Sequence, residues 1–352
     1  MLVSLLLSNI FIPNESLAKH KFKKKFVFFS IINFMNKKTL GKTEITVTPV
    51  GMGVLTVGKT QLNLPVEKGA ELIRHALDRG INFLDTAEYY ETYKYIQSAL
   101  SSSKHEAVIS SKSLSCDYFG MQNAIEEARK ALNRDVIDIF LLHEVRSQMD
   151  FISRVGAWEC LNDYKAKNIL KAIGLSTHHI DVTEYAANIK DLDIVFTLTN
   201  FKSLGIRKND TFGSKEEMAC AIKTLSEAQK GVFTMKTFGG GNLTSDYIKA
   251  LDYANSIEGV DSIMIGMGSI ADIDNAVDYF ENRLSEDFVP DVTKKIMRID
   301  QGDCEACYAC IKKCPNKAIQ INNAGLAEID PKTCITCGYC APVCPVRAII
   351  MY

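Results

Sequence analysis

The sequence predicts a (β/α)₈ barrel followed by a small cysteine-rich domain. Between Leu40 and about Asn282, eight short apolar runs alternate with eight segments of helical character. The runs are continuously apolar, which is typical of strands buried on both faces of a parallel sheet. Eight such units in about 240 residues favour a barrel, with an open doubly wound sheet as the alternative. Eight of the 11 cysteines lie between residues 304 and 344.

The composition is that of a globular protein. Hydrophobic residues make up 47% of the 352 residues and charged residues 24%. This balance excludes a wholly disordered or collagen-like chain. The 41 basic and 42 acidic residues give a net charge of −1. Without a basic excess, we expect no nucleic-acid partner.

Each predicted strand is a short apolar run, and Gly, Asp or polar residues end most of them. The strands are expected at Val47–Gly51, Ile81–Leu84, Ala107–Ser110, Val136–Leu142, Leu170–Leu175, Ile194–Leu198, Val232–Met235 and Ile263–Ile265. Each strand is followed by a predicted helix. The helices are expected at Val66–Arg79, in a polar segment ending at Leu100, and at about 120–132, 155–167, 181–190, 215–229, 245–256 and 270–280.

The segments outside the barrel differ from it in character. Residues 1–36 contain two apolar runs that flank a basic cluster, and neither run reaches the ~20 residues needed to span a bilayer. A signal peptide or a membrane-surface anchor would explain the segment, but we favour an unstructured or spurious extension, with the true start at or near Met35. We assign 37–282 to the barrel, 283–299 to a polar and helical connector, and 300–352 to the second domain.

The second domain contains an internal sequence repeat. The run Cys304, Cys307, Cys310 and Cys314 recurs as Cys334, Cys337, Cys340 and Cys344, and a Pro follows the last Cys of each run. Two zinc sites or a set of disulfides are the alternatives to iron–sulfur clusters. Three closely spaced cysteines and a trailing Pro, repeated twice, favour clusters.

This segment resembles a bacterial-type two-cluster ferredoxin over nearly all of 300–352. In such domains the fourth Cys of each run binds the other cluster. Cys304, Cys307, Cys310 and Cys344 are therefore expected to hold one [4Fe–4S] cluster. Cys334, Cys337, Cys340 and Cys314 are expected to hold the second. Residues 322–325 are predicted to turn between two short strands, and the clusters favour a reducing, cytoplasmic location and oxygen sensitivity.

Four polar residues occur at or just after the predicted ends of consecutive barrel strands, where catalytic groups of barrel enzymes lie. They are Asp85, Tyr90, Lys112 and His143. Singly, each has a structural interpretation, such as a helix cap, a surface charge or a core histidine. Together they suggest acid–base chemistry, with Lys112 lowering the pKa of Tyr90. Asp85 would hold Lys112 charged, and His143 would orient a substrate carbonyl.

The segment Gly80–Tyr90 resembles the aldo/keto reductase signature G-x-N-F-x-D-T-A-x-x-Y. Residues 138–143 resemble that family's D-x-x-L-L-H strand, and 174–177 its G-x-S-N segment, with Thr177 in place of Asn. With the cysteine domain, the chain is similar to ferredoxin-fused members. The resemblance implies Tyr90 as general acid, and a small-molecule carbonyl or alcohol as substrate.

The resemblance also implies NAD(P)H as cofactor. Candidate cofactor-binding residues are Ser176, Gly239, Gly240, Gly241, Gly266, Gly268, Ser269 and Asn275. Some positions depart from the family. Glu91 replaces the Gly after the catalytic Tyr, and Lys236 stands where the family places an aromatic residue against the nicotinamide. No Lys or Arg lies within 263–276 to bind a 2′-phosphate. The three consecutive glycines could cradle a phosphate of a dinucleotide or of a flavin, or could form a simple turn.

We therefore predict an oxidoreductase that couples carbonyl reduction or alcohol oxidation to electron relay through two [4Fe–4S] clusters. Hydride transfer moves two electrons and each cluster moves one, so a bound flavin is a candidate converter. A redox protein is the expected macromolecular partner. The alternative is an electron-transfer protein whose barrel holds a flavin or docks a partner. A plain nicotinamide enzyme with structural clusters is a third hypothesis.

Overall fold

The computed structural model describes residues 35–352. The extension predicted for 1–36 lies outside the described residues except for its last two positions. Met35 is buried against the barrel core. The barrel domain therefore begins no later than Met35, slightly before the predicted boundary at 37.

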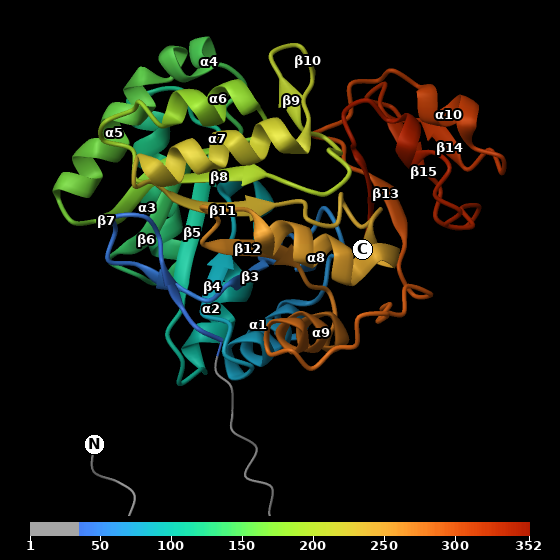
Figure 1. Ribbon diagram of the computed structural model, residues 1–352, viewed down its shortest axis with the longest axis horizontal. Coiled ribbons are helices and arrows are strands. Elements are labelled where there is room, and N and C mark those ends of the chain that lie inside the picture. Colours follow the sequence, from blue (N-terminus) through green and yellow to red (C-terminus); the bar gives the residue numbers. More distant parts are fainter. Residues whose placement is uncertain (1–34) are drawn as a thin grey trace, which may run out of the picture. The chain divides into compact units, whose positions relative to one another are not determined.

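Eight parallel strands close into a barrel, as predicted (Figure 1). Neighbouring strands follow one another in chain order, and the last pairs with the first. The strands are β3 (Val50–Gly53), β4 (Phe83–Asp85), β5 (Val108–Ser113), β6 (Ile137–Leu142), β7 (Leu170–Thr177), β8 (Ile194–Leu198), β11 (Gly231–Met235) and β12 (Ser262–Gly266). Nearly every residue in them is buried, which explains their continuous apolar sequences.

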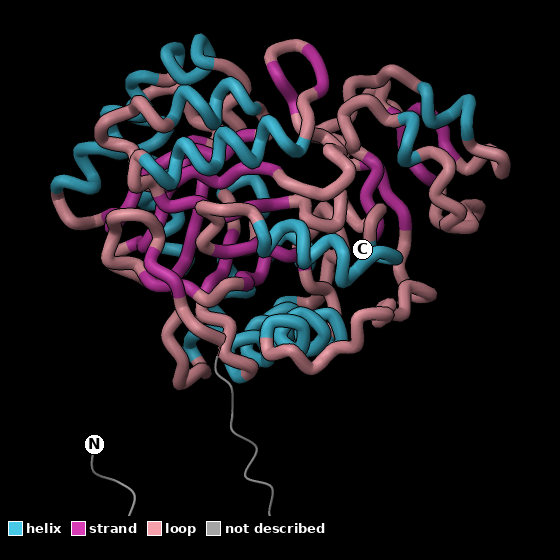
Figure 2. The backbone as a smooth tube through the Cα atoms, in the orientation of Figure 1, coloured by secondary structure: helices cyan, strands magenta, loops and turns pink. Residues whose placement is uncertain are grey.

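Helices surround the strands (Figure 2). They are α1 (Val66–Asp78), α2 (Tyr93–Ser101), α3 (Tyr118–Leu132), α4 (Gln148–Ser153), α5 (Val155–Ala166), α6 (Ile180–Ala186), α7 (Lys215–Glu227), α8 (Tyr247–Ser256) and α9 (Ile270–Phe280). Several starts follow from side-chain caps. Asp117 caps α3, and Ser214 with Glu217 forms a capping box on α7.

The amino-terminal end of the barrel is closed by a hairpin of β1 (Lys38–Thr39) and β2 (Thr46–Val47). Leu40, Ile45 and Val47 form a buried cluster with inward-facing strand residues such as Phe83 and Phe233. The first barrel strand consequently begins at Val50, later than the predicted Val47. The apolar run 45–47 belongs to this plug rather than to the barrel wall.

The connector is not the helix predicted for 283–299. Between Phe280 and Met297 the structure contains turns and extended chain. Pro290 lacks an N–H to donate within a helix and restricts the residue before it. β13 (Met297–Ile299) pairs with the C-terminal strand β16 (Ile349–Met351). The second domain thus begins at 297 rather than 300.

The C-terminal domain repeats its backbone conformation as well as its cysteines. Ala306, Tyr308 and Lys317 have positive φ values, and so do their equivalents in the second half of the repeat, Thr336, Gly338 and Arg347. Strands β14 (Ile319–Ile321) and β15 (Ala327–Ile329) form a hairpin around the predicted turn at 322–325. The helical segment α10 (Ala309–Lys313) contains the third Cys of the first run, and η4 (Ala341–Val343) directly follows the third Cys of the second run.

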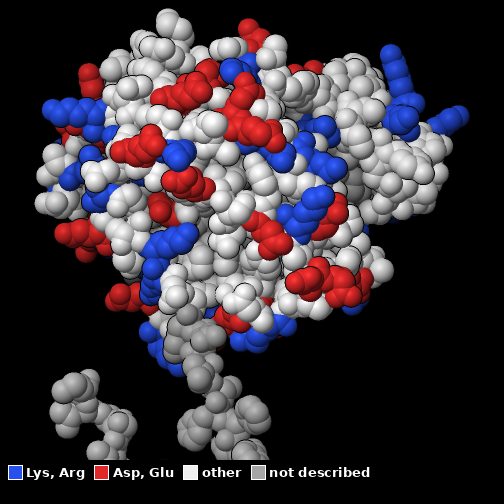
Figure 3. All heavy atoms as spheres, in the orientation of Figure 1, with Lys and Arg blue, Asp and Glu red and all other residues white. Residues whose placement is uncertain are grey.

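The surface carries both signs of charge. On the face drawn in Figure 3, Lys and Arg side chains are interspersed with Asp and Glu. A short hairpin, β9 (Arg207–Lys208) with β10 (Thr211–Phe212), lies between β8 and α7. None of the helices within residues 35–352 is long and apolar enough to cross a bilayer.

Candidate active site

The structure brings the four predicted catalytic residues together at the carboxyl ends of consecutive strands. Asp85 is the last residue of β4, Lys112 lies in β5, and His143 follows β6. Tyr90 ends the short helix η2 (Glu88–Tyr90) that follows β4. Because parallel strands in a barrel end on the same rim, residues far apart in sequence converge there.

Lys112 and Asp85 form a buried ion pair. Lys112 Nζ lies 2.7 Å from Asp85 Oδ2 and 2.5 Å from the carbonyl oxygen of Thr86. Both side chains are almost completely buried. Burial lowers the pKa of Lys112 and raises the pKa of Asp85, and each partner's charge offsets part of that shift. Asp85 Oδ1 is buried without a hydrogen-bond partner in the described part of the chain.

Tyr90 faces both Lys112 and His143. Its hydroxyl lies 3.4 Å from His143 Nε2, and Lys112 Nζ lies 4.7 Å from the centre of its ring. The expectation of a lowered Tyr90 pKa is wrong for the net shift, although the positive charge of Lys112 favours the phenolate. Burial raises the pKa of Tyr90 well above its ordinary value, and the charges of Asp85 and Asp303 add to the effect. The Lys112 charge is already paired with Asp85, and Asp303 comes from the C-terminal domain.

His143 is a neutral imidazole at ordinary pH. Burial lowers its pKa well below the usual value, and the neighbouring positive charges of Lys112 and Arg154 contribute. The carbonyl of His143 accepts a hydrogen bond from Arg154 at 2.8 Å. A neutral imidazole with its proton on Nε2 can donate to an oxygen placed beside the Tyr90 hydroxyl. That is the role predicted for His143.

A cavity lies over this group, between the barrel and the C-terminal domain. Asp85 and Tyr90 line it from the barrel, and Asp300, Asp303 and Tyr352 line it from the C-terminal domain. The remaining walls combine apolar and polar residues: Gly53, Leu55, Thr56, Gln61, Phe196, Met235, Lys236, Thr237, Phe238, Gly240, Gly241, Thr244, Tyr247, Met264, Ile265, Gly266, Asp272, Pro290, Lys295, Ile350 and Met351. Thr237 Oγ1 and Tyr352 Oη are buried without a partner within residues 35–352.

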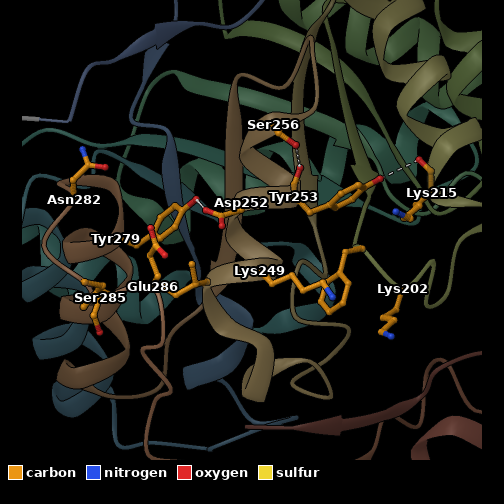
Figure 4. Close-up of a pocket in the computed structure, with 13 residues that line it drawn as sticks. Lys202, Lys215, Lys249, Asp252, Tyr253, Ser256, Tyr279, Asn282, Ser285 and Glu286 are labelled. Atoms are coloured by element: carbon orange, nitrogen blue, oxygen red, sulfur yellow. Dashed lines mark hydrogen bonds between the residues drawn. The ribbon is translucent and has the colours of Figure 1, made fainter.

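A second hollow lies elsewhere, beside α8 and α9 (Figure 4). It contains none of the four predicted catalytic residues. Several of its polar groups are paired among themselves. Tyr279 donates to Asp252, and Tyr253 donates to the carbonyl of Lys215. We therefore place the candidate active site at the barrel rim.

Several predicted cofactor residues are engaged by the protein itself. Ser176 Oγ accepts a hydrogen bond from the Glu144 N–H at 2.8 Å. Ser269 caps α9, and the Gly268 N–H donates to Asp272 Oδ2 at 3.0 Å. A Cβ on Gly266 would lie 2.3 Å from Thr56 Oγ1, so this glycine allows close packing. Asn275 lies half-buried on α9.

The three glycines after β11 contact the C-terminal strand. All three have positive φ values. The Met351 N–H donates to the carbonyl of Gly240 at 2.7 Å, and a Cβ on Gly241 would lie 2.1 Å from the Met351 carbonyl oxygen. Asn242 strengthens the contact through a bond to the carbonyl of Ile349. The packing of β16 accounts for the glycine turn, and Gly240 and Gly241 also line the cavity, so the phosphate-binding role stays a prediction.

Lys236 makes the contact that the sequence did not predict. Its Nζ lies 3.2 Å from Asp303 Oδ2. Its φ value of +58° is unfavourable for a residue with a side chain. Asp303 immediately precedes Cys304. The departure from an aromatic residue marked Lys236 as unusual, but its partner lies in the other domain and only the fold reveals it.

The cysteines group as predicted from the crossed ligand pattern. Burial raises the pKa of Cys310, and the nearby thiols of Cys344 and Cys307 add to the effect. A small cavity is lined by all four cysteines expected at the second cluster, Cys314, Cys334, Cys337 and Cys340. The fourth Cys of each run thus lies with the other run. The donor set fits two iron–sulfur clusters.

Backbone N–H groups point at cysteine sulfurs in both halves. The Ala318 N–H lies 3.3 Å from Cys314 Sγ, and the Ala348 N–H lies 3.3 Å from Cys344 Sγ. Such bonds tune the reduction potentials of clusters. Within residues 35–352, no three Cys, His, Asp or Glu side chains are close enough to hold a single metal ion. A [4Fe–4S] cluster binds each Cys through a different iron, which spreads the four sulfurs apart.

Comparison with known proteins agrees with this picture. The aldo/keto reductase family model matches residues 49–256, and a 4Fe-4S dicluster domain model matches 296–346. The uncharacterized oxidoreductase YqkF of Bacillus subtilis is 23% identical over 218 residues, which are 57% of this chain and 68% of that protein. Methylglyoxal reductase DkgA of Yersinia pestis is 28% identical over 134 residues, 37% of this chain and 45% of that protein.

Solved structures share the fold. A Pseudomonas aeruginosa protein assigned to the aldo-keto reductases superposes with a TM-score of 0.60 at 20% identity, covering 71% of this chain and 96% of that one. The holo form of AKR11C1 from Bacillus halodurans gives a TM-score of 0.56 at 17% identity, covering 73% of this chain and 98% of that one. The chain belongs to the aldo/keto reductase family and carries a 4Fe-4S dicluster domain at its C-terminal end.

Proposed function

We propose that this oxidoreductase reduces a small carbonyl compound, or oxidises the matching alcohol, and exchanges the electrons through its C-terminal domain. One observation carries the proposal. A single cavity is lined by Asp85 and Tyr90 of the barrel and by Asp300 and Asp303 of the C-terminal domain, and Asp303 immediately precedes the expected cluster ligand Cys304. The acid–base group and the cysteine domain therefore adjoin the same space.

The roles of the barrel residues follow from their positions. A carbonyl oxygen between Tyr90 and His143 would accept hydrogen bonds from the hydroxyl and from Nε2. Because its pKa is raised, Tyr90 is protonated at neutral pH, and it gives up the proton only as negative charge develops on the substrate oxygen. Lys112, beside the ring, stabilises the phenolate that remains. Asp85 keeps Lys112 in place.

Reduction of a carbonyl to an alcohol consumes two electrons and two protons. When bound, the two clusters supply or accept electrons one at a time. The crossed cysteines Cys304, Cys307, Cys310 and Cys344 would hold one cluster, and Cys314, Cys334, Cys337 and Cys340 the other. A low-potential redox protein is the expected partner for the clusters, and a flavin remains our candidate for converting one-electron into two-electron steps.

The test uses anaerobic, reconstituted protein with its clusters reduced by dithionite. A panel of neutral aldehydes and ketones is added, and reoxidation is followed by cluster absorbance while the alcohol is quantified. We expect Tyr90→Phe to slow carbonyl-dependent reoxidation by ~10²–10⁴-fold. Tyr89→Phe is the matched control, because its ring is exposed and it belongs to the same turn. Equal rates in wild type and Tyr90→Phe would remove Tyr90 from the proposed mechanism.

A second candidate is an electron-transfer protein in which the barrel performs no carbonyl chemistry. The Lys236–Asp303 ion pair favours it, because it uses the nicotinamide-facing position of the family for a contact between domains. The same experiment separates the two. If no carbonyl reoxidises the reduced clusters while an oxidised redox protein does, the carrier function is correct.

A further inference from the structure

Three positions predicted to contact a bound dinucleotide make contacts within the chain itself instead. They are the residue facing the nicotinamide after β11, the glycine turn that follows it, and the loop between β12 and α9. Residues 295–352 contact each of these positions, directly at the first two and through Lys295 at the third. We infer that the C-terminal domain and its connector take the place of the dinucleotide, so that the barrel of the intact protein does not bind NAD(P)H.

The nicotinamide-facing position is the first. Family members carry a flat aromatic side chain there, and this chain has Lys236. The Lys236 ammonium bonds to Asp303 at 3.2 Å, and both side chains are about three-quarters buried. Asp300 lines the same cavity. A nicotinamide ring in the usual place would meet an ion pair and a further carboxylate instead of an aromatic face.

The glycine turn is the second position. Residues 239–241 could have presented N–H groups to a pyrophosphate. Instead, β16 lies against them, with the Met351 N–H bonded to the Gly240 carbonyl at 2.7 Å. Ideal Cβ atoms on Gly240 and Gly241 would lie 2.9 Å from Ile350 and 2.1 Å from Met351. β16 thus fills the side of the turn on which a Cβ would lie, and a phosphate bound on that side would have to displace the strand.

The start of α9 is the third position. A helix N-terminus with free N–H groups attracts phosphate. Here the carboxylate of Asp272 accepts the Gly268 N–H at 3.0 Å, and Lys295 of the connector bonds to Asp272 at 3.1 Å. The carboxylate repels a phosphate, and the cation that could attract one is already paired.

The charge of the cavity agrees with these contacts. The charged residues that line the cavity are Lys236 and Lys295 with Asp85, Asp272, Asp300 and Asp303, and Asp85 is paired with the buried Lys112. An excess of carboxylates disfavours a ligand with two or three phosphates. It is compatible with an uncharged carbonyl compound.

The test measures binding directly. Intact reconstituted protein is titrated anaerobically with NADPH, NADH and 2′,5′-ADP by calorimetry. We expect no binding up to millimolar concentration. Asp272→Ser removes the carboxylate and frees both the Gly268 N–H and Lys295, so it should bind 2′,5′-ADP at least tenfold more tightly than wild type. Asp274→Ser is the matched control, because it removes one charge from the same helix on the side that faces α1, where Asp274 pairs with His75 and Arg79.

A micromolar Kd of wild type for NADPH, competed by 2′,5′-ADP, would overturn the inference. So would the failure of Asp272→Ser to gain affinity. The inference rests on the proposed function, but the experiment distinguishes the failure of one from the failure of the other. If NADPH binds and bleaches the clusters while carbonyls still reoxidise them, only the inference is wrong. If neither NADPH nor any carbonyl interacts, only the proposed function is wrong.

Discussion

Replacing Lys112 by Met should reveal the energetic cost of the buried ion pair beneath the active site. The change removes the ammonium but retains an unbranched side chain of comparable length. It leaves Asp85 charged, buried and without its 2.7 Å partner. Breaking a buried pair in this way typically costs ~3–5 kcal/mol. For a barrel of this size we expect the melting temperature to fall by roughly 6–20 °C.

The loss should depend on pH in a defined direction. Without Lys112, burial alone acts on Asp85, so its folded pKa lies above its unfolded value. A raised folded pKa favours the folded state at low pH, and that contribution is lost as pH rises through the folded pKa. Lys112→Met should therefore be least destabilised near pH 5 and most destabilised near pH 8.

The assay is thermal unfolding followed by tryptophan fluorescence. Trp158 is the protein's single Trp and is buried in α5, so it reports on the barrel rather than on the clusters. The double variant Lys112→Met/Asp85→Asn removes both charges and should recover most of the lost stability. Lys223→Met is the control, because Lys223 forms an exposed pair with Glu258 at 2.9 Å. That substitution should leave the melting temperature nearly unchanged, because solvent screens exposed pairs.

The reasoning would be refuted by either of two results. One is a loss in Lys112→Met no larger than that of Lys223→Met. The other is a double variant less stable than the single one. Each result would mean that Asp85 is not held as a buried charge by Lys112, and the proposed stabilisation of the Tyr90 phenolate would lose its basis.

Three further predictions concern separate parts of the molecule. Glu91 occupies a left-handed conformation with φ of +55°, which is unfavourable for a residue with a side chain. Glu91→Gly should therefore raise the free energy of unfolding by about 1 kcal/mol, measured by urea unfolding. A lower free energy of unfolding in the variant would contradict this. Because the folded pKa of His143 is lowered, the free energy of unfolding of the wild type should decrease as the pH falls below about 6.5. In His143→Gln this decrease should be smaller by about 1.4 kcal/mol per pH unit. Equal pH slopes of the two unfolding free energies would show that the imidazole is charged in the folded protein. The double variant Cys314→Ser/Cys334→Ser should lose half of the iron, and the double variant Cys304→Ser/Cys334→Ser should lose all of it. Iron analysis and electron paramagnetic resonance measure the clusters that remain. Loss of all the iron in Cys314→Ser/Cys334→Ser would contradict the crossed ligand sets.

Much of this molecule is determined locally along its sequence. The barrel strands are apolar at every position because they are buried on both faces, and the helices between them show a different periodicity. The contrast between apolar strands and amphipathic helices can be recognised in the sequence alone, and it predicted all eight β/α units. The cysteine repeat is equally local, since ligand spacing reflects the geometry of a cluster. The family signature around Tyr90 likewise marked the catalytic candidates.

The errors arose where long-range contacts decide the outcome. The run at Val47 reads as a strand, but it packs as a plug under the barrel with Leu40 and Ile45. The connector reads as helical, yet Pro290 and the pairing of residues 297–299 with the C-terminal strand keep it extended. Local patterns indicate which conformations are available, and packing selects among them.

The chemistry of the site depends still more on tertiary structure. Asp85, Tyr90, Lys112 and His143 can be chosen from the sequence, but the pKa of Tyr90 cannot. It rises because burial removes solvent and because Asp300 and Asp303 lie close, although both belong to the C-terminal domain. The same domain supplies the partner of Lys236. The sequence alone thus determines the fold and marks the candidate catalytic side chains and cluster ligands. The electrostatics and the lining of the cavity arise only from the packing of the C-terminal domain against the barrel, because charge and desolvation act through space.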